Sequence, residues 1–258
     1  MTEGSDGRSK QQLADSFGAI AYDYERARPG YPEEAVEWIT GGHPRIILDV
    51  AAGTGKLTAQ LAHLGNFVVG LEPSLDMLNR LRAAHPRIPA TAGRAEALPF
   101  AEESFDLITV AQAFHWFDQP VAIAEFARVL RPRGHLAILW NFRDDSVDWV
   151  AELSKLIGSE GAEKEQELSY DPFPSSSLFG PSINRTFRLE QPLDRALLIR
   201  LVRTRSYVAT LSSDEQGVLL GKVGRLCDEH PSLSSHSQFL MPYRTEVFLS
   251  ERTFQTSL

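Results

Sequence analysis

The feature that most constrains the fold of this chain is the stretch over residues 46–72, where two apolar runs flank a glycine-containing turn and a helical pattern. The first run, residues 46–50, is typical of a buried parallel strand. Leucines at helical spacing follow over residues 56–64, and a second apolar run covers residues 67–72. The order predicts a strand, a helix and a parallel strand at the centre of an α/β domain.

Two glycines and an acid in this unit predict a nucleoside-binding site. Gly53 and Gly55 allow the backbone to come close to a ligand, and the start of the following helix presents unpaired N–H groups. Glu72 ends the second strand about twenty residues after the glycines, where an acid can accept hydrogen bonds from both ribose hydroxyls.

The spacing excludes two common nucleotide sites. A dinucleotide fingerprint needs a third glycine, which the loop lacks, and Lys56 precedes Leu57 where a phosphate-binding loop has serine or threonine. Asp49 lies just before the loop, where a carboxylate repels a pyrophosphate but suits a cationic amino group.

Together with later stretches, this unit resembles the class I methyltransferases that use S-adenosylmethionine. The resemblance is to the small-molecule (type 11) branch near the ubiquinone- and trans-aconitate-type enzymes, and it covers roughly residues 17–141. Residues 48–55 (LDVAAGTG) match the first family motif, with Ala51 in place of its usual first glycine. The other matches are the ribose-binding turn at 69–74, the adenine-binding loop at 93–100, the fourth strand at 104–110 and the turn before the fifth strand at 130–136.

The resemblance implies an α/β fold with a Rossmann-like, seven-stranded, mostly parallel sheet, an antiparallel edge hairpin, helices on both faces and a helical cap. Residues 1–10 are polar and are expected to be disordered. Residues 11–141 are expected to form the cofactor-binding core with an N-terminal lid helix, and residues 142–258 the cap and the segment that completes the sheet. Within this last part we expect a surface helix over 149–168 and a mobile loop over 170–181.

The implied cofactor is S-adenosyl-L-methionine, with S-adenosyl-L-homocysteine as product. We expect Glu72 to hold the ribose, Glu96 the adenine amino group, and Asp49 the cofactor amino group through water or a backbone relay. In the family the N-terminal segment closes over the cofactor, which places Arg28 near the methionine carboxylate; the alternative is a solvated Arg28. The residues expected to bind the cofactor are Tyr22, Arg28, Asp49, Ala51, Gly53, Gly55, Glu72, Pro73, Met77, Ala95, Glu96, Ala111 and Gln112.

The loop over residues 111–118 is expected to face the transferring methyl group, because ligands of open parallel sheets bind beyond the carboxyl ends of the strands. His115 in this loop is a candidate general base, and the alternative is that it only lines the pocket. Arg200, Arg203 and Arg205 would make a cationic cap that attracts a carboxylate, or would simply face water. The residues expected to contact the acceptor are Tyr31, His115, Trp116, Trp140, Arg205 and Tyr207.

Composition limits the partners. The 258 residues carry a net charge of −8, which argues against nucleic acid because phosphates favour a basic face. No apolar run is long enough to cross a bilayer, and residues 1–10 do not resemble a signal peptide. The single cysteine, Cys227, cannot form an internal disulfide, which fits a cytoplasmic protein. We expect no metal, and a monomer or weak homodimer.

The function that these residues favour is methyl transfer from S-adenosylmethionine to a small molecule, with a carboxylate oxygen as the leading acceptor. A carbon or phenol oxygen in a quinone- or lipid-like acceptor is the alternative within the enzymes. A catalytically silent protein that binds S-adenosylmethionine stays open as well. A nicotinamide-dependent reductase is disfavoured, since the chain lacks the third glycine and a Tyr-x-x-x-Lys pair.

Overall fold

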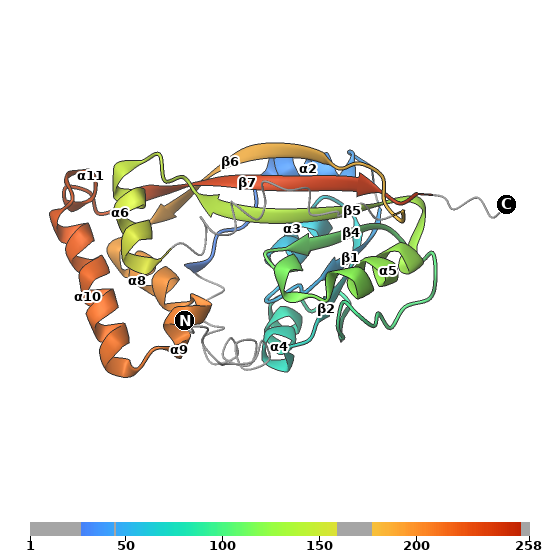
Figure 1. Ribbon diagram of the computed structural model, residues 1–258, viewed down its shortest axis with the longest axis horizontal. Coiled ribbons are helices and arrows are strands. Elements are labelled where there is room, and N and C mark those ends of the chain that lie inside the picture. The colour runs from blue at the N-terminus through green and yellow to red at the C-terminus, as the bar shows by residue number, and fades with distance from the viewer. Residues whose placement is uncertain (1–26, 44, 159–176, 254–258) are drawn as a thin grey trace, which may run out of the picture.

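The computed structural model describes residues 27–43, 45–158 and 177–253, which form a seven-stranded sheet in the order β3-β2-β1-β4-β5-β7-β6 (Figure 1). The pairs among β3, β2, β1, β4 and β5 are parallel, and β7 runs antiparallel to both β5 and β6. The expected fold class is therefore confirmed. The strands are β1 (Ile46–Val50), β2 (Phe67–Glu72), β3 (Ala90–Ala92), β4 (Phe105–Ala111), β5 (Leu130–Arg143), β6 (Ile183–Leu193) and β7 (Phe239–Glu251).

Helices cover both faces of the sheet and also gather beyond one of its ends (Figure 1). The helices of the core are α2 (Glu33–Thr40), α3 (Lys56–His63), α4 (Leu75–Ala84), the 3-10 turn η1 (Phe114–Trp116) and α5 (Gln119–Val129). Those at the far end, which we call the cap, are α6 (Asp148–Ile157), α8 (Arg195–Arg203), α9 (Ser206–Thr210), α10 (Ser213–Glu229) and α11 (Pro231–Ser234).

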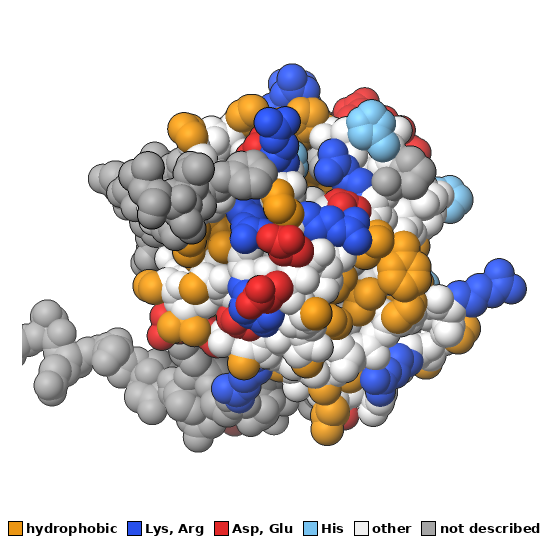
Figure 2. All heavy atoms as spheres, turned by 90° about the vertical axis from the view of Figure 1, so that its right-hand side faces the viewer, with side chains coloured by type: hydrophobic (Ala, Val, Ile, Leu, Met, Phe, Trp, Pro, Cys, Tyr) orange, Lys and Arg blue, Asp and Glu red, His pale blue; other side chains and the backbone are white. Residues whose placement is uncertain are grey.

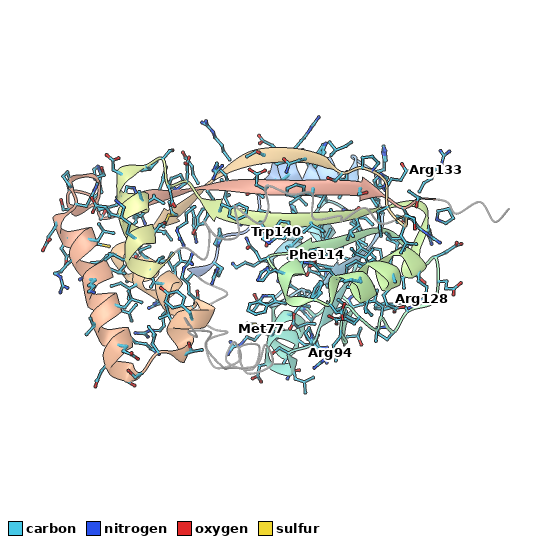
Figure 3. The ribbon with its side chains drawn as sticks, in the orientation of Figure 1. Met77, Arg94, Phe114, Arg128, Arg133 and Trp140 are labelled. Atoms are coloured by element: carbon cyan, nitrogen blue, oxygen red, sulfur yellow. The ribbon has the colours of Figure 1, made fainter. Side chains whose placement is uncertain are left out.

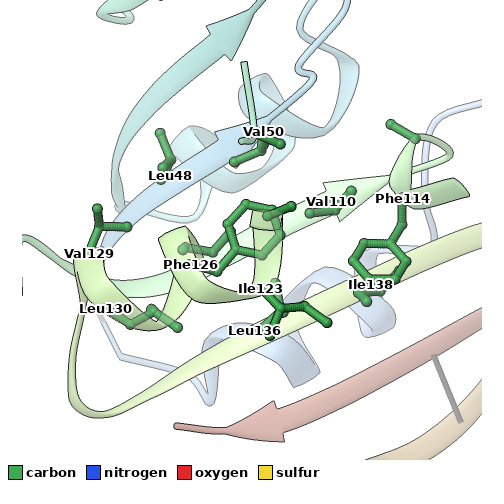
Figure 4. Close-up of a cluster of buried hydrophobic side chains, with 14 of the residues drawn as sticks. Leu48, Val50, Val110, Phe114, Ile123, Phe126, Val129, Leu130, Leu136 and Ile138 are labelled. Carbon is green, nitrogen blue, oxygen red and sulfur yellow. The ribbon is translucent and has the colours of Figure 1, made fainter. Parts of the chain in front are cut away.

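Alternation along the central strands sends apolar side chains to both faces, as expected for a sheet covered on both sides. Leu48 and Ile108 belong to the cluster that packs against Phe126 of α5 (Figure 4). Their neighbours Ile47 and Leu107 belong to a second cluster with α2 and α3. This two-sided burial fixes the register of the parallel strands, and so fixes which residues stand at their carboxyl ends.

Strand β5 is longer than its parallel neighbour and carries the cap. Its pairing with β4 ends at Leu139, whereas its pairing with β7 continues to Arg143. Residues 140–143 therefore overhang the parallel part of the sheet. A third apolar cluster, which includes Trp149, Leu198, Val223 and Tyr243, joins the cap helices to this overhang.

Two boundaries differ from the sequence prediction. The sequence analysis places a turn at 130–136 before the fifth strand, but the strand already starts at Leu130. The irregularity appears as a shift of register opposite Phe105 and Leu107 of β4. The end of the predicted loop over 170–181 is anchored, since Phe179 is 6% exposed and Gly180 N–H donates to the carbonyl oxygen of Glu251. The predictions for residues 1–10, for the lid helix up to residue 26 and for 159–168 lie outside the described residues.

None of the helices in residues 27–43, 45–158 and 177–253 is long and apolar enough to cross a bilayer. On the end of the molecule opposite the cap, acidic and basic side chains lie beside one another (Figure 2). That face therefore lacks the unbroken positive charge that nucleic-acid phosphates favour.

Candidate functional site

The candidate site lies where the carboxyl ends of β1, β2 and β4 face the cap, and the backbone there is unusual. Ala51 follows β1 and Gln112 follows β4, and their φ angles are 56° and 59°. This left-handed conformation costs residues with a Cβ atom about 1–2 kcal/mol. Glu103 and Arg133 adopt similar angles elsewhere, but Ala51 and Gln112 lie at the carboxyl edge, where open parallel sheets bind their ligands.

The two glycines of the first motif have different roles. A Cβ atom at Gly55, where φ is 92°, would lie 2.9 Å from the Leu81 Cγ atom, so Gly55 is required by packing. A Cβ atom at Gly53, where φ is 59°, would meet nothing within 4 Å. Gly53 therefore borders open space, which is what a backbone that approaches a ligand requires.

Asp49 is buried at the end of β1 and is held by two hydroxyl groups. Its carboxylate oxygens accept hydrogen bonds from Thr58 Oγ1 at 2.6 Å and from Thr109 Oγ1 at 2.7 Å. Burial nevertheless raises the pKa of Asp49 to about 6. A buried, mostly ionised carboxylate with this surrounding is poised to pair with a cationic amino group.

Glu72 connects the glycine loop to the start of α4. One carboxylate oxygen accepts the Gly53 N–H at 2.8 Å, and the other accepts the Ser74 N–H at 2.9 Å. Ser74 caps α4, because its side chain accepts the Met77 N–H. Glu72 is 6% exposed, and burial raises the pKa of its carboxyl group. The acid is thus fixed beside Gly53, in the position expected of a ribose acceptor.

The expected adenine loop is fixed by α5. The Glu96 Oε1 atom accepts the Asp118 N–H at 3.0 Å, which ties this loop to the segment after β4. The Arg128 guanidinium donates to the carbonyl oxygens of Leu98 and Phe100, and it also pairs with Glu125 at 2.7 Å. Figure 3 shows Met77, Phe114 and Trp140 at the end of the core that faces the cap, whereas Arg128 and Arg133 lie at the opposite end.

A short segment over residues 27–31, which we call the strap, crosses from the cap to the core. The Arg28 guanidinium donates to the hydroxyl and the carbonyl oxygen of Thr204, both at 3.2 Å. The Asn141 side chain donates to the Gly30 carbonyl oxygen at 2.9 Å. The Gln60 amide accepts the Tyr31 N–H at 3.0 Å and donates to its carbonyl oxygen at 2.7 Å. These bonds fix the strap over the edge of the sheet.

A cavity lies between the glycine loop, the strap, the overhang of β5 and the cap. It encloses about 1180 Å³ of empty space, counting the part that opens to solvent. Several residues that the sequence analysis assigns to the cofactor or the acceptor line the cavity: Arg28, Tyr31, Asp49, Ala51, Gly53, Ala111, Gln112, Trp140 and Arg205.

Other predicted site residues do not line this cavity. Glu72 approaches it only through the Gly53 N–H. His115 and Trp116 pack against each other with ring centroids 4.8 Å apart and ring planes tilted by 43°, and neither residue lines the cavity. Arg200 and Arg203 are exposed. The further residues outside the lining are Gly55, Pro73, Met77, Ala95, Glu96 and Tyr207, and Tyr22 lies outside the described residues.

The lining also contains polar residues that the sequence analysis did not assign, namely Thr54, Lys56, Asn141, Arg143, Asp145 and Tyr243. Asn141 and Arg143 come from the overhang of β5, and Tyr243 comes from β7. The sequence pattern places Tyr243 on one face of a strand, but only the pairing of β5 with β7 shows that this part of the strand extends past the core.

Comparison with known proteins agrees with the geometry. Residues 48–138 match the model of a methyltransferase domain family. An uncharacterized methyltransferase of Mycobacterium tuberculosis is 39% identical over 237 residues, which cover 92% of this chain and 96% of the relative. An uncharacterized methyltransferase-like protein of Schizosaccharomyces pombe is 33% identical over 92% of this chain and 95% of the relative.

A solved structure shares the fold. The structure of a putative type II methyltransferase from Anaeromyxobacter dehalogenans superposes with a TM-score of 0.62 at 24% identity, over 87% of this chain and 96% of that one. The family match, the relatives that align over nearly their whole length and the shared fold all agree with the motif residues at the carboxyl edge of the sheet. The chain therefore belongs to the class I S-adenosylmethionine-dependent methyltransferases, and S-adenosylmethionine is its cofactor.

Proposed function

We propose that this methyltransferase transfers the methyl group to an oxygen of a small carboxylate. The observation that carries the proposal is the charge of the cavity. Among the described residues, its lining contains four cations, Arg28, Lys56, Arg143 and Arg205, and two acids, Asp49 and Asp145. This excess of cations occurs in a chain whose net charge is −8, so it is local to the cavity.

The described residues fit the cofactor. Gly53 leaves open space for it, Asp49 is suited to its ammonium group, and Arg28 is suited to its carboxylate. Glu72 would hold the ribose, and the loop around Glu96 the adenine. When bound, the cofactor supplies a methyl group on a positively charged sulfur, already activated for displacement.

The cations beyond those needed by the cofactor favour an anionic acceptor. Arg28 neutralises one carboxylate, that of the cofactor methionine. Arg143 and Arg205 line the same cavity, where their positive charge favours a second anion. A carboxylate acceptor is ionised near neutral pH and needs no general base. The protein then has to hold the acceptor in line with the methyl group and exclude water. His115 as a general base remains a separate prediction.

The test is a transfer assay with S-adenosylmethionine labelled in the methyl group. The substrates are small aliphatic and aromatic carboxylic acids, each paired with its methyl ester, and a set of phenols and quinols. We expect label in base-labile methyl esters of the acids. Base-stable label in the phenols or quinols would favour the carbon or phenol alternative. Cofactor binding without transfer to any compound would favour a silent binding protein.

We also propose a cytoplasmic location, which the lone Cys227 supports, and a monomer or weak homodimer.

A further inference from the structure

The overhang of the sheet places two polar side chains directly opposite each other at the cap end of the cavity. Arg143 is the last residue of β5, and its partner across the antiparallel pair is Tyr243 of β7. Side chains opposite each other in such a pair share one face of the sheet, with Cβ atoms roughly 5 Å apart. Both residues line the cavity.

The side chain of Tyr243 is largely buried, but its hydroxyl keeps contact with the cavity. The residue is 6% exposed, and its hydroxyl forms no hydrogen bond with any residue of the described ranges. The hydroxyl is not among the described polar atoms that are closed off from solvent without a partner, so it is open to the space of the cavity that Tyr243 lines. The hydroxyl of a residue that lines a cavity can gain a partner from a ligand.

The surroundings of Tyr243 keep its phenol neutral and make it a donor. Burial raises the pKa of Tyr243 to about 12, although Arg28 and Arg143 act in the opposite direction. The phenol therefore does not serve as a base near neutral pH. It can donate a hydrogen bond to an anionic oxygen, beside two guanidinium groups that favour such an oxygen.

Arg143 is held in place from the cap. Its Nε atom donates to Ser154 Oγ at 3.0 Å, and Ser154 Oγ donates to the Asp145 carboxylate at 2.7 Å. Ser154 lies on α6 and is 8% exposed. This chain of bonds orients the guanidinium next to Tyr243, so donors from two strands converge on one region.

We propose that Tyr243 binds the acceptor, its hydroxyl donating a hydrogen bond to an acceptor carboxylate oxygen beside Arg143. The inference rests on the proposed function, because it takes the acceptor to be a carboxylate. Tyr243 thereby selects for an anionic acceptor, and Arg28 is left to the cofactor. The oxygen that Tyr243 holds is the one that is not methylated, since a donated hydrogen bond lowers the nucleophilicity of an oxygen.

The test uses the full chain saturated with S-adenosylhomocysteine and the variant Tyr243→Phe, which removes only the hydroxyl. Binding is measured by calorimetry for succinate, hexanoate, benzoate and cinnamate, and for their methyl esters. We expect acids to bind better than esters, and Tyr243→Phe to weaken the binding of the acids roughly tenfold or more. Affinity for S-adenosylhomocysteine should change less than about twofold.

Thr186→Val is the matched control. It removes a hydroxyl from β6, the strand that pairs with the other edge of β7. Thr186 is exposed, and its hydroxyl bonds to the Glu246 carboxylate. This variant should bind the acids as the wild type does. The melting temperature of the ligand-free protein separates a binding role from a structural one. Loss of a hydroxyl that bonds to no described residue should leave the melting temperature unchanged or raise it. A clear fall in the melting temperature of Tyr243→Phe would overturn the inference.

The remaining outcomes are distinguishable. Equal binding of acids by wild type and Tyr243→Phe overturns the role of Tyr243 but leaves the carboxylate acceptor standing. Weaker binding of S-adenosylhomocysteine by Tyr243→Phe assigns the phenol to the cofactor and also overturns the inference. If no acid binds the wild type, the carboxylate proposal fails, and the inference fails with it.

Discussion

The backbone N–H of Gly53 donates a hydrogen bond to the Glu72 carboxylate at 2.8 Å, and so joins the glycine loop after β1 to the end of β2. The same carboxylate accepts the Ser74 N–H, and Glu72 is almost fully buried. This acid is therefore oriented before any ligand arrives. Preorganised acceptors bind ligand hydroxyls without the cost of ordering a side chain.

Glu72→Ala should weaken the binding of S-adenosylhomocysteine roughly 10- to 100-fold, because it removes a charged hydrogen-bond acceptor. His115→Ala should change this affinity by less than about threefold, because the loop that carries His115 is expected to face the acceptor and not the ribose. Calorimetry measures both values, and Glu72→Gln, which keeps the size of the side chain, shows whether charge is needed. Equal affinities for the two alanine variants would contradict the ribose assignment.

Cofactor affinity should depend on pH through Asp49. Burial raises the pKa of this group to about 6, so the folded state binds more protons than the unfolded chain between about pH 4 and pH 6. Its contribution to folding stability therefore falls as the pH rises through that window. Binding has the opposite sign, since the cofactor ammonium needs the ionised carboxylate.

Affinity for S-adenosylhomocysteine should accordingly fall as the pH drops below about 6, by up to tenfold per pH unit. Calorimetric titrations between about pH 5 and pH 8 measure this dependence. Asp49→Asn should bind more weakly at neutral pH and lose the dependence. A wild-type affinity that stays constant over this range would exclude a pairing between Asp49 and the ammonium group.

Much of the fold and part of the site follow from the sequence alone. Asp49, Gly53 and Glu72 lie where strand ends and a glycine turn predict them, because parallel strands buried on both faces fix their own register. The acceptor end does not follow in this way. Arg143 and Tyr243 meet only because β5 and β7 pair beyond the end of β4, and that length depends on packing against the cap.

The two glycines of the loop should respond differently to alanine. Gly55→Ala should destabilise the protein by about 2 kcal/mol or more, because the new Cβ atom would lie 2.9 Å from Leu81 at a left-handed φ angle. Gly53→Ala should cost only the conformational term of about 1 kcal/mol, but its methyl group would stand in the ligand space.

Urea unfolding and calorimetry with S-adenosylhomocysteine separate the two effects. The free energy of unfolding should fall mainly in Gly55→Ala. The affinity for S-adenosylhomocysteine should fall in Gly53→Ala, even after correction for the fraction of folded protein. If Gly53→Ala bound the ligand as tightly as the wild type, the open space at Gly53 would not be part of the cofactor site.

Ala51→Gly should stabilise the protein slightly. Ala51 replaces the usual glycine of the motif and adopts a φ of 56°, a strain of about 1–2 kcal/mol. Glycine removes that strain but costs about 0.5–1 kcal/mol in chain entropy, so the expected net gain is up to about 1.5 kcal/mol. Urea unfolding measures it, with Ala52→Gly, a neighbour without a left-handed φ angle, as the control that should not be stabilised. A loss of stability in Ala51→Gly would mean that the alanine methyl group makes contacts that outweigh the strain.

The central claim is that the carboxyl edge of the sheet binds the adenosyl cofactor, and a crystal structure of the full chain with S-adenosylhomocysteine tests it most directly. We predict ligand density beyond β1 and β2, with both ribose hydroxyls within hydrogen-bond distance of the Glu72 carboxylate. Ligand bound elsewhere, or a Glu72 carboxylate that contacts only the Gly53 and Ser74 N–H groups, would contradict the account.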